Sequence, residues 1–344
     1  MNDLVRKPMT ELSKAYRERL LSPVEVVDAY LGNIEALEPK LGAYQTVYAD
    51  DARAAAEGAA KAFRSGHRIG PFHGLPFALK DIVDLEGRVT TGGSAVFRDR
   101  ISPVTATIAK RLIAAGGILL GKTKTVEVAM GGWGTNQHMG TPWNPWDLDV
   151  PRTPGGSSAG SGVSVAACMA GCAVGTDTGG SVRLPAAWCG IVGLKVTEGR
   201  LPTDGIIPLS HTLDTPGPMT RTVADTVLMF ETMDGRHPSD TDNDLTHRDG
   251  LFGELDKGVA GLRFGCLSPE ERQGVDLDIL EIYDAALDQL RGLGAEIVPF
   301  APPMAFEDMQ DQAGVISASE GYFHHGERYE DLSLPLDEDV RPRV

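Results

Sequence analysis

The stretch from Pro154 to Thr197 constrains the fold of this 344-residue chain more than any other segment. It contains two glycine-rich clusters, Gly155-Gly156-Ser157-Ser158 and Gly179-Gly180-Ser181, joined by a run of small apolar residues. Glycine loses more backbone freedom on folding than any other residue, so paired glycines inside ordered structure predict backbone that has to bend sharply. Each cluster delivers a serine beside exposed N–H groups. That arrangement suits acyl chemistry, in which a nucleophile needs oriented donors for the oxyanion it creates.

Composition and charge are those of a globular protein with a large core. Hydrophobic residues make up 42% of the chain and charged residues 23%, and the length allows two or three domains or one large α/β domain. The formal net charge of -16 makes polyanions poor partners, so we expect no direct contact with nucleic acid; solubility is the simpler explanation of such a surface.

The cellular setting is inferred from segments that are absent. The N-terminus MNDLVRKPMTEL has no apolar leader, and no stretch has the apolar length of a membrane span. Four cysteines are too few for a disulfide framework in a chain of this length. We therefore expect a cytoplasmic protein with reduced thiols and no membrane contact.

Alternating helical and strand patterns predict an α/β fold with a substantially parallel sheet. Helices are expected over 9–36 (in two pieces divided at Ser22-Pro23), 50–64, 105–115, 159–174 and 221–233, and strands over 74–83 and 118–120. Ser22 and Glu25 resemble a capping box, and Cys168 and Cys172 are expected to be core residues of the 159–174 helix.

The remaining segments are predicted to be irregular, except near the C-terminal end. The ranges 131–156 and 175–185 have no sustained period, and 234–258 is predicted to be a linker or a surface excursion. Residues 261–267, 276–292 and 296–300 form a predicted β–α–β unit.

One motif fits a phosphate-binding loop by letter only. Gly116 to Thr123 matches G-x-x-x-x-G-K-[ST]. Phosphate binding needs a loop that follows a strand and leads into a helix, but here Ile-Leu-Leu in the middle is a strand pattern and a helix precedes it. We therefore predict no nucleotide site there.

A second motif, Gly156-Ser157-Ser158-Ala159-Gly160, matches the G-x-S-x-G nucleophile elbow. That elbow joins a strand directly to a helix, whereas residues 146–154 contain two prolines and no apolar run. The mechanism would also need a downstream histidine, and none of the candidates stands in a distinctive setting: His211, His237, His247, His324 and His325. Histidine spacing predicts no metal site either.

A base other than histidine is therefore needed. Lysine can serve where burial lowers its pKa and keeps it neutral, and Lys80 ends the apolar run from Leu75 to Leu79. The alternative is a surface lysine paired with Asp81. The tryptophans of the 131–156 segment also allow two interpretations, because Trp133, Trp143 and Trp146 could line a substrate pocket or pack the loop onto the core.

Four segments together resemble the amidase signature family. They are GLPFALKDI around Lys80, PGGSSAGSG at 154–162, GTDTGGSVRLPAAWCGIVGLKVT at 175–197 and GPMTRTVAD at 217–225. The similarity covers roughly residues 9–300, and its diagnostic part is 74–225. The resemblance implies an amidase signature fold: a large mixed, substantially parallel β-sheet covered by helices on both faces (α/β/α), as a single domain over 1–344.

The resemblance also implies a role for each site residue. Ser181 would be the nucleophile, Ser157 the bridging serine after a cis Gly156–Ser157 bond, and Lys80 the base. The oxyanion donors map to the N–H groups of Thr178, Gly179, Gly180 and Ser181, and the segment Ala129, Met130, Gly131 is expected to approach the substrate. Asp177 and Arg183 are expected to hold the loop, while Ser158 and Ser161 satisfy backbone groups.

The activity implied is hydrolysis of a small carboxylic amide through an acyl-enzyme, with no cofactor or metal. The alternative is the amidase subunit of a glutamyl- or aspartyl-tRNA amidotransferase, which releases ammonia from glutamine and works with partner chains; the Trp-rich loop 131–146 favours the hydrolase. A third alternative, a non-catalytic binding protein, is disfavoured because Lys80, Ser157 and Ser181 are all present. The expected partner is a small-molecule amide, and a homodimer is kept as an alternative.

The end of the chain departs from the family pattern. The sequence stops at Pro342-Arg343-Val344, soon after a helix-like acidic region. The resemblance implies further strands and helices after this point, which complete the sheet and one wall of the acyl pocket. We therefore expect that the C-terminal part of the family domain is missing.

Overall fold

The computed structural model describes residues 3–235 and 250–344. The chain divides into two compact units, one formed by Met1–Leu245 with Ser317–Val344 and the other by Thr246–Ile316. The helices of the first unit are α1 (Met9–Arg17), α2 (Pro23–Leu41), α3 (Ala49–Ser65), α4 (Thr107–Ala114), α5 (Ala159–Ala166), α6 (Arg183–Cys189) and α7 (Val223–Asp234). Its strands are β1 (Tyr44–Val47), β2 (Pro76–Lys80), β3 (Ile118–Thr123), β4 (Cys172–Asp177), β5 (Val192–Gly193) and β6 (Thr215–Thr220), and its short 3₁₀ helices are η1 (Asp3–Arg6), η2 (Ala95–Phe97), η3 (Glu127–Ala129) and η4 (Arg341–Arg343).

The six strands of the first unit form one mixed sheet in the order β1-β3-β2-β4-β6-β5. The central strands β3, β2 and β4 are parallel, and the outer strands pair antiparallel. Every residue of β2, β4 and β6 is buried. Successive side chains of a strand point to opposite faces, so both faces of the sheet are covered. The structure therefore has the predicted mixed sheet, parallel at its centre and covered on both faces.

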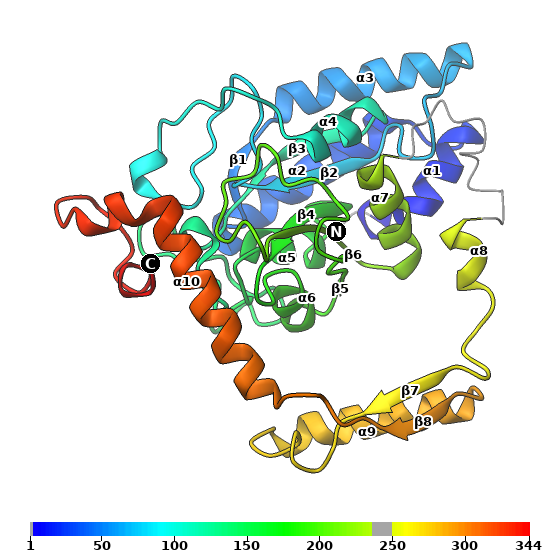
Figure 1. Cartoon of the computed structure of the whole chain (residues 1–344). Coiled ribbons are helices and arrows are strands. Elements are labelled where there is room, and N and C mark those ends of the chain that lie inside the picture. The colour runs from blue at the N-terminus through cyan, green and yellow to red at the C-terminus, as the bar shows by residue number, and fades with distance from the viewer. Residues whose placement is uncertain (1–2, 236–249) are drawn as a thin grey trace. The chain divides into compact units, whose positions relative to one another are not determined.

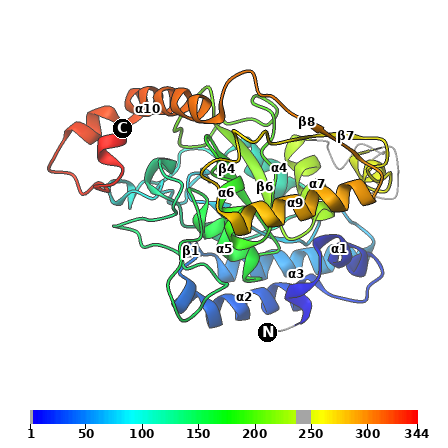
Figure 2. The same cartoon turned by 90° about the horizontal axis from the view of Figure 1, so that it is seen from below.

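Helix α2 begins where the sequence predicts it. The Ser22 N–H donates to the Glu25 carboxylate at 2.8 Å, and the Ser22 side chain accepts from the first turn, which completes the predicted capping box. Gly42, with φ of 57°, ends the helix in the left-handed region. Helices α2 and α3 lie side by side (Figure 1 and Figure 2).

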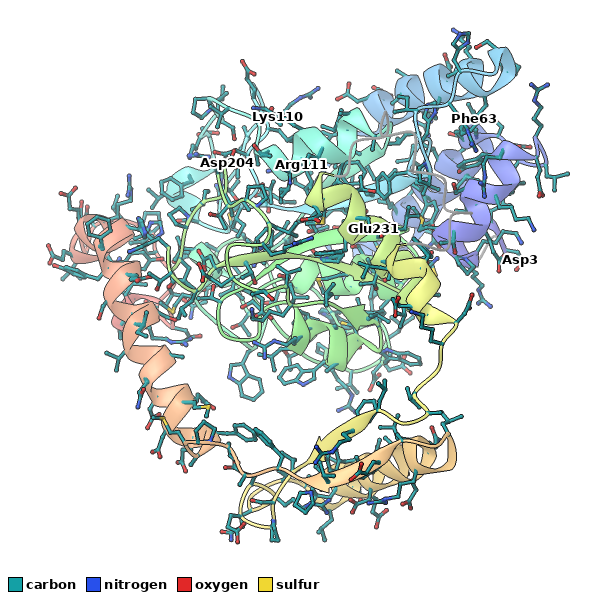
Figure 3. All side chains as sticks on the ribbon, turned by 45° about the vertical axis from the view of Figure 1, so that its right-hand side comes forward. Asp3, Phe63, Lys110, Arg111, Asp204 and Glu231 are labelled. Atoms are coloured by element: carbon teal, nitrogen blue, oxygen red, sulfur yellow. The ribbon has the colours of Figure 1, made fainter. Side chains whose placement is uncertain are left out.

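Helices α4 and α7 are joined by an arginine. Arg111 of α4 donates from its guanidinium to the Met233 carbonyl in the last turn of α7 at 2.6 Å, and its side chain is labelled in Figure 3. A cation at the C-terminal carbonyls of a helix complements the helix dipole. This contact fixes two helices that are far apart in sequence.

The prediction of a helix over 159–174 is wrong in its second half. The helix α5 ends at Ala166, Cys168 has a positive φ of 56°, and Cys172 begins strand β4. Strand β4 also extends into the segment 175–185 that was predicted to be irregular. The run from Val165 to Val174 consists of small apolar residues with no polar face, so periodicity alone cannot separate a buried helix from a buried strand.

The other expected elements lie within a few residues of their predicted bounds. The segment 131–156 contains no helix or strand, as predicted. Of the predicted linker 234–258, residues 236–249 lie outside the described residues. None of the helices in the described ranges is long and apolar enough to cross a bilayer.

The second unit contains the predicted β–α–β unit. Its elements are α8 (Leu251–Leu255), β7 (Arg263–Cys266), α9 (Leu277–Gly292) and β8 (Glu296–Pro299). Strands β7 and β8 are parallel neighbours. Helix α10 (Phe306–Glu330) begins in this unit, and from Ser317 onward it belongs to the first. Whether the two units form one domain stays a prediction.

Candidate active site

Lys80 is the last residue of the central strand β2 and is fully buried. Its Nζ lies 2.8 Å from Ser157 Oγ and 2.7 Å from Thr176 Oγ1. Burial lowers the pKa of Lys80 to about 7, although the negative charges of Asp214 and Asp177 act in the opposite direction. At neutral pH a substantial fraction of this lysine is therefore uncharged.

Ser157 follows a cis Gly156–Ser157 peptide bond, as predicted. Its carbonyl accepts from Val126 N at 3.2 Å and from Thr125 Oγ1 at 2.9 Å. A Cβ at position 156 would lie 2.6 Å from the Gly134 backbone nitrogen. The paired glycine is thus required by a close backbone approach, and the Ser157 hydroxyl is directed at Lys80.

Ser181 lies in the loop between β4 and α6 and is 7% exposed. The loop contacts the first cluster through the Ser158 N–H, which donates to the Ser181 carbonyl at 3.3 Å. Among the described residues no hydrogen bond joins Ser181 Oγ to Ser157 Oγ. The structure thus joins Lys80 to Ser157 directly and brings Ser181 into the adjacent loop.

The Asp177 carboxylate organises the loop that carries Ser181. It accepts from the backbone N–H groups of Gly180 at 2.7 Å and Val182 at 3.1 Å. The Arg183 guanidinium donates to it at 2.9 and 3.1 Å. Burial opposes the charge, but Arg183 and the backbone donors still lower the pKa of Asp177. As predicted, Asp177 and Arg183 hold the loop.

The loop leaves open most of the N–H groups that were predicted as oxyanion donors. The Gly180 N–H is occupied by Asp177, whereas within the described ranges the N–H groups of Thr178, Gly179 and Ser181 donate no hydrogen bond. The Thr178 hydroxyl donates to the Asp214 carboxylate, which fixes the first of these residues.

The segment 129–131 lies against the first glycine cluster. A Cβ on Gly156 would be 2.9 Å from the Gly131 carbonyl oxygen. Val128 and Ala129 both have positive φ, 42° and 63°, which is rare for residues with a side chain and marks a strained backbone. Contact of Ala129, Met130 and Gly131 with a substrate stays a prediction.

Two residues that the sequence did not point to are part of this geometry. Thr176, in β4, accepts a hydrogen bond from Lys80; it lies in the range 175–185, which was predicted to be irregular. Asp214 accepts from Thr178 and from the N–H groups of Leu209 and Ser210 at 2.8 and 3.0 Å. It lies 36 residues beyond Thr178, and no local pattern identifies it.

The neighbouring serines satisfy backbone groups, as predicted. Ser158 Oγ donates to the Thr176 carbonyl and accepts from the Thr176 N–H, both at 3.2 Å. Ser161 Oγ donates to the Val174 carbonyl at 3.0 Å. Neither hydroxyl is directed at Lys80.

The residues that match the phosphate-loop pattern have a structural role and form no phosphate-binding loop. The segment 116–123 follows helix α4 and forms strand β3, as the inverted order predicted. Lys122 is fully buried and its Nζ lies 2.9 Å from the Asp81 carboxylate. No strand precedes Ser157 within the 131–156 segment, so the elbow motif lacks its context as well.

Two tryptophans of the long loop, Trp133 and Trp146, pack against helix α6 and its C-terminal cap, whereas the Trp143 ring lies under Lys40 Nζ of α2, 4.2 Å from the ring centroid. Trp133 and Trp188 have ring centroids 5.5 Å apart, and Trp146 Nε1 donates to the Cys189 carbonyl at 2.7 Å. Trp133 and Trp146 remain 65% and 74% exposed. Across the part of the chain that the structure describes, no group of three or more His, Cys, Asp or Glu side chains is arranged to hold a metal ion.

Comparison with known proteins now adds to this geometry. A family model described as Amidase matches residues 25–333. The chain belongs to the amidase family. It is 40% identical over 301 residues to a glutamyl-tRNA(Gln) amidotransferase subunit from Anaeromyxobacter dehalogenans strain 2CP-C, with 88% of this chain and 61% of that protein covered. It is 37% identical over 337 residues to the 2-amino-5-chloromuconic acid deaminase of Comamonas testosteroni, covering 98% of this chain and 71% of that protein.

A solved structure supports the same family. The native peptide amidase of Stenotrophomonas maltophilia matches with a TM-score of 0.81 at 31% identity, covering 96% of this chain and 69% of that one. The chain spans about 61% of the length of the amidotransferase subunits it matches. The amidase family is thus shown for this chain, while the roles of its individual residues are proposals.

Proposed function

We propose that the chain is an amidohydrolase that cleaves the C–N bond of a small carboxylic amide. In this proposal Ser181 is the nucleophile, Ser157 the bridging serine and Lys80 the base, and the products are the carboxylate and ammonia or an amine. The observation that carries it is the buried 2.8 Å contact between Lys80 Nζ and Ser157 Oγ. A lysine whose pKa is lowered to about 7 can accept a proton near neutral pH.

The acylation half begins with a proton relay. Neutral Lys80 accepts the Ser157 hydroxyl proton while Ser157 Oγ accepts the proton of Ser181, whose oxygen bonds to the amide carbonyl carbon. The carbonyl π electrons move to oxygen, and the relay then returns a proton to the nitrogen so that the C–N bond breaks. Hydrogen bonds between catalytic groups often tighten only when substrate is bound, so we propose that the Ser157–Ser181 contact forms in the substrate complex.

The open N–H groups of Thr178, Gly179 and Ser181 are the proposed oxyanion donors. The N–H of Gly180 is already used by Asp177, so it contributes by fixing the loop. Losing one oxyanion donor typically raises the barrier by about 2.7–4 kcal/mol. In the second half a water gives up its proton through the same relay and attacks the acyl-enzyme, which releases the carboxylate and restores Ser181.

Single alanine variants of the three residues test this proposal. Turnover of aliphatic, aromatic and amino-acid primary amides is measured for Ser181→Ala, Ser157→Ala and Lys80→Ala, with Ser158→Ala as the matched control. We expect Ser181→Ala to show only background and the other two to lose at least about 100-fold. Wild-type turnover in Ser181→Ala rejects the assignment, and a loss confined to Ser158→Ala favours the elbow motif.

The second candidate is the amidase subunit of a tRNA amidotransferase. It is supported by the 40% identity to a glutamyl-tRNA(Gln) amidotransferase subunit. The exposed Trp133 and Trp146 on the long loop favour the hydrolase in this proposal, because exposed aromatic side chains suit contact with varied acyl groups. Ammonia release from glutamine that depends on added partner chains would favour the amidotransferase.

A further inference from the structure

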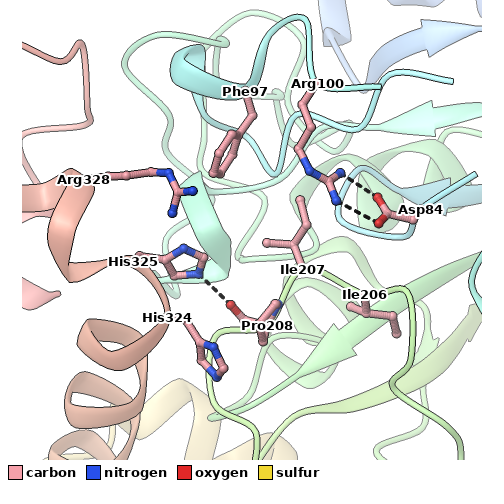
Figure 4. Close-up of a pocket in the computed structure, with 9 residues that line it drawn as sticks. All are labelled: Asp84, Phe97, Arg100, Ile206, Ile207, Pro208, His324, His325 and Arg328. Atoms are coloured by element: carbon pink, nitrogen blue, oxygen red, sulfur yellow. Dashed lines mark hydrogen bonds and ion pairs between the residues drawn. The ribbon is translucent and has the colours of Figure 1, made fainter. Parts of the chain in front are cut away.

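A hollow of about 230 Å³ is lined by residues of the first unit. It is bounded by η2, the segment 206–208 and the last turns of α10, and Figure 4 shows the side chains that line it. Neither Lys80, Ser157 nor Ser181 lines this hollow. It therefore needs an explanation of its own.

Arg328 supplies the positive charge on one side of the hollow. The guanidinium of Arg328 lies over the Phe97 ring, with Cζ 5.1 Å from the ring centroid. In the described ranges no carboxylate lies within 4.0 Å of it. Arginine presents a planar set of donors that matches a carboxylate, and an aromatic face beneath it keeps the fork oriented.

The other charges of the hollow cancel. Arg100 and Asp84 form a two-point ion pair, with N–O distances of 2.7 and 2.9 Å. Figure 4 shows the Arg100 guanidinium turned toward Asp84 and the Arg328 guanidinium near His325 and Phe97. The net charge of the lining groups is thus that of Arg328, in a chain whose formal net charge is -16.

The remaining walls are apolar and fixed. His325 is 5% exposed, and its Nε2 lies 2.7 Å from the Pro208 carbonyl, so this nitrogen is the donor. Burial lowers the pKa of His325, which leaves the ring uncharged. Ile206, Ile207 and Pro208 complete the apolar surface, and the His324 ring also lines the hollow.

We propose that this hollow is a binding site for a small organic carboxylate with a compact apolar body, whose carboxylate pairs with Arg328. Drug-sized pockets start at about 300 Å³, so a hollow of about 230 Å³ suits a small ligand. The site is separate from the proposed catalytic residues, and its test needs no turnover.

Isothermal titration with isobutyrate and benzoate tests the site on the full chain. The variants are Arg328→Gln, which removes the charge, and Arg98→Gln as the matched control. Arg98 is an exposed arginine beside Phe97 that does not line the hollow. Both arginines are exposed, so both variants should fold. A Ser181→Ala chain separates this site from the proposed acyl site.

We expect saturable binding by the wild type and by Arg98→Gln and Ser181→Ala, and at least a tenfold weaker association with Arg328→Gln. Phe97→Leu should weaken benzoate without removing it. The proposal is overturned if the wild type shows no saturable binding, if Arg328→Gln binds as the wild type does, or if both arginine variants weaken equally. None of these results bears on amide hydrolysis, so the two proposals fail independently.

Discussion

At the scale of single residues, the proposed chemistry depends on how a buried lysine is surrounded. Among the described residues of the first unit, Lys80 and Lys122 are both fully buried. Lys122 is buried as an ion pair, because its Nζ lies 2.9 Å from the Asp81 carboxylate. Lys80 has two hydroxyl partners, and among the described residues no carboxylate lies within 4.0 Å of it. A buried cation without a paired anion is costly, which favours the neutral form that a base requires.

This difference predicts how activity depends on pH. Only neutral Lys80 can accept a proton, so kcat/KM should rise tenfold per pH unit on the acid side and level off above about 7, the lowered pKa. The same shift makes the unfolded chain bind the extra proton between about 7 and 10.5, so this group's contribution to stability also rises with pH in that window. The measurement is kcat/KM as a function of pH with a stable primary amide. A value of kcat/KM that stays constant through pH 7 would contradict the prediction.

At the scale of elements, the site is assembled from segments that are far apart in sequence. Strands β2 and β4 are parallel neighbours, which brings Lys80 and Thr176 to the same end of the sheet. The 207–214 segment contributes Asp214, and helix α10 holds that segment through Glu320, which accepts from Ser210 and Thr212. Burial opposes its charge, but these hydrogen bonds lower the pKa of Glu320 to about 2. The Glu320 carboxylate therefore stays ionised over the working range of pH.

Asp214→Asn tests this connection. The variant keeps the shape but removes the charge, and the two backbone N–H groups and the Thr178 hydroxyl can no longer all be satisfied. We expect a fall in kcat and a loss of about 1–3 kcal/mol of unfolding free energy. Because the Asp214 charge raises the pKa of Lys80, the acid limb should also move to lower pH. If the acid side of the pH–rate profile and kcat are both unchanged, Asp214 does not act on the site.

Gly156→Ala tests the close backbone approach at the first cluster. Its Cβ would lie 2.6 Å from Gly134 N and 2.9 Å from the Gly131 carbonyl. Overpacking of this kind costs about 1–3 kcal/mol, so the midpoint of urea unfolding should fall and activity with it. Gly32→Ala is the control, because nothing lies within 4 Å of that position in α2, and alanine there should be neutral or stabilising. Equal midpoints for both variants would show that the close approach does not constrain position 156.

Sequence and structure agree where a local signal exists. The capping box of α2, the inverted order at 116–123 and the β–α–β unit all follow from periodicity and end signals. The Val165–Val174 run has no polar face, so the sequence predicts a helix that continues past Ala166, where α5 ends. Thr176 and Asp214 contact the site through strand register and a long loop, which local patterns do not encode. Lys80, Ser157 and Ser181 were assigned by family resemblance, because spacing alone left a surface lysine as the alternative.

At the scale of the whole molecule, the family is established and the substrate is open. The chain spans about 61% of the length of the amidotransferase subunits it matches. Its relatives include an amidotransferase subunit, a deaminase and a peptide amidase. Its net charge of -16 disfavours direct contact with tRNA.

The isolated chain should therefore hydrolyse simple primary amides without any partner. We expect its kcat/KM for benzamide or isobutyramide to exceed that for glutamine, with ammonia release as the measurement. The Ser181→Ala chain serves as the background. A clear preference for glutamine that appears only with added partner chains would support the amidotransferase alternative.

The central claim is that the acyl group is carried by Ser181. The most direct measurement is peptide mapping by mass spectrometry of the chain quenched in acid during turnover of a primary amide. We predict the acyl mass on the peptide that contains Ser181. No adduct should form in Ser181→Ala, while Ser158→Ala should still carry it. An adduct on Ser157 or Ser158, or one that persists in Ser181→Ala, would contradict the claim.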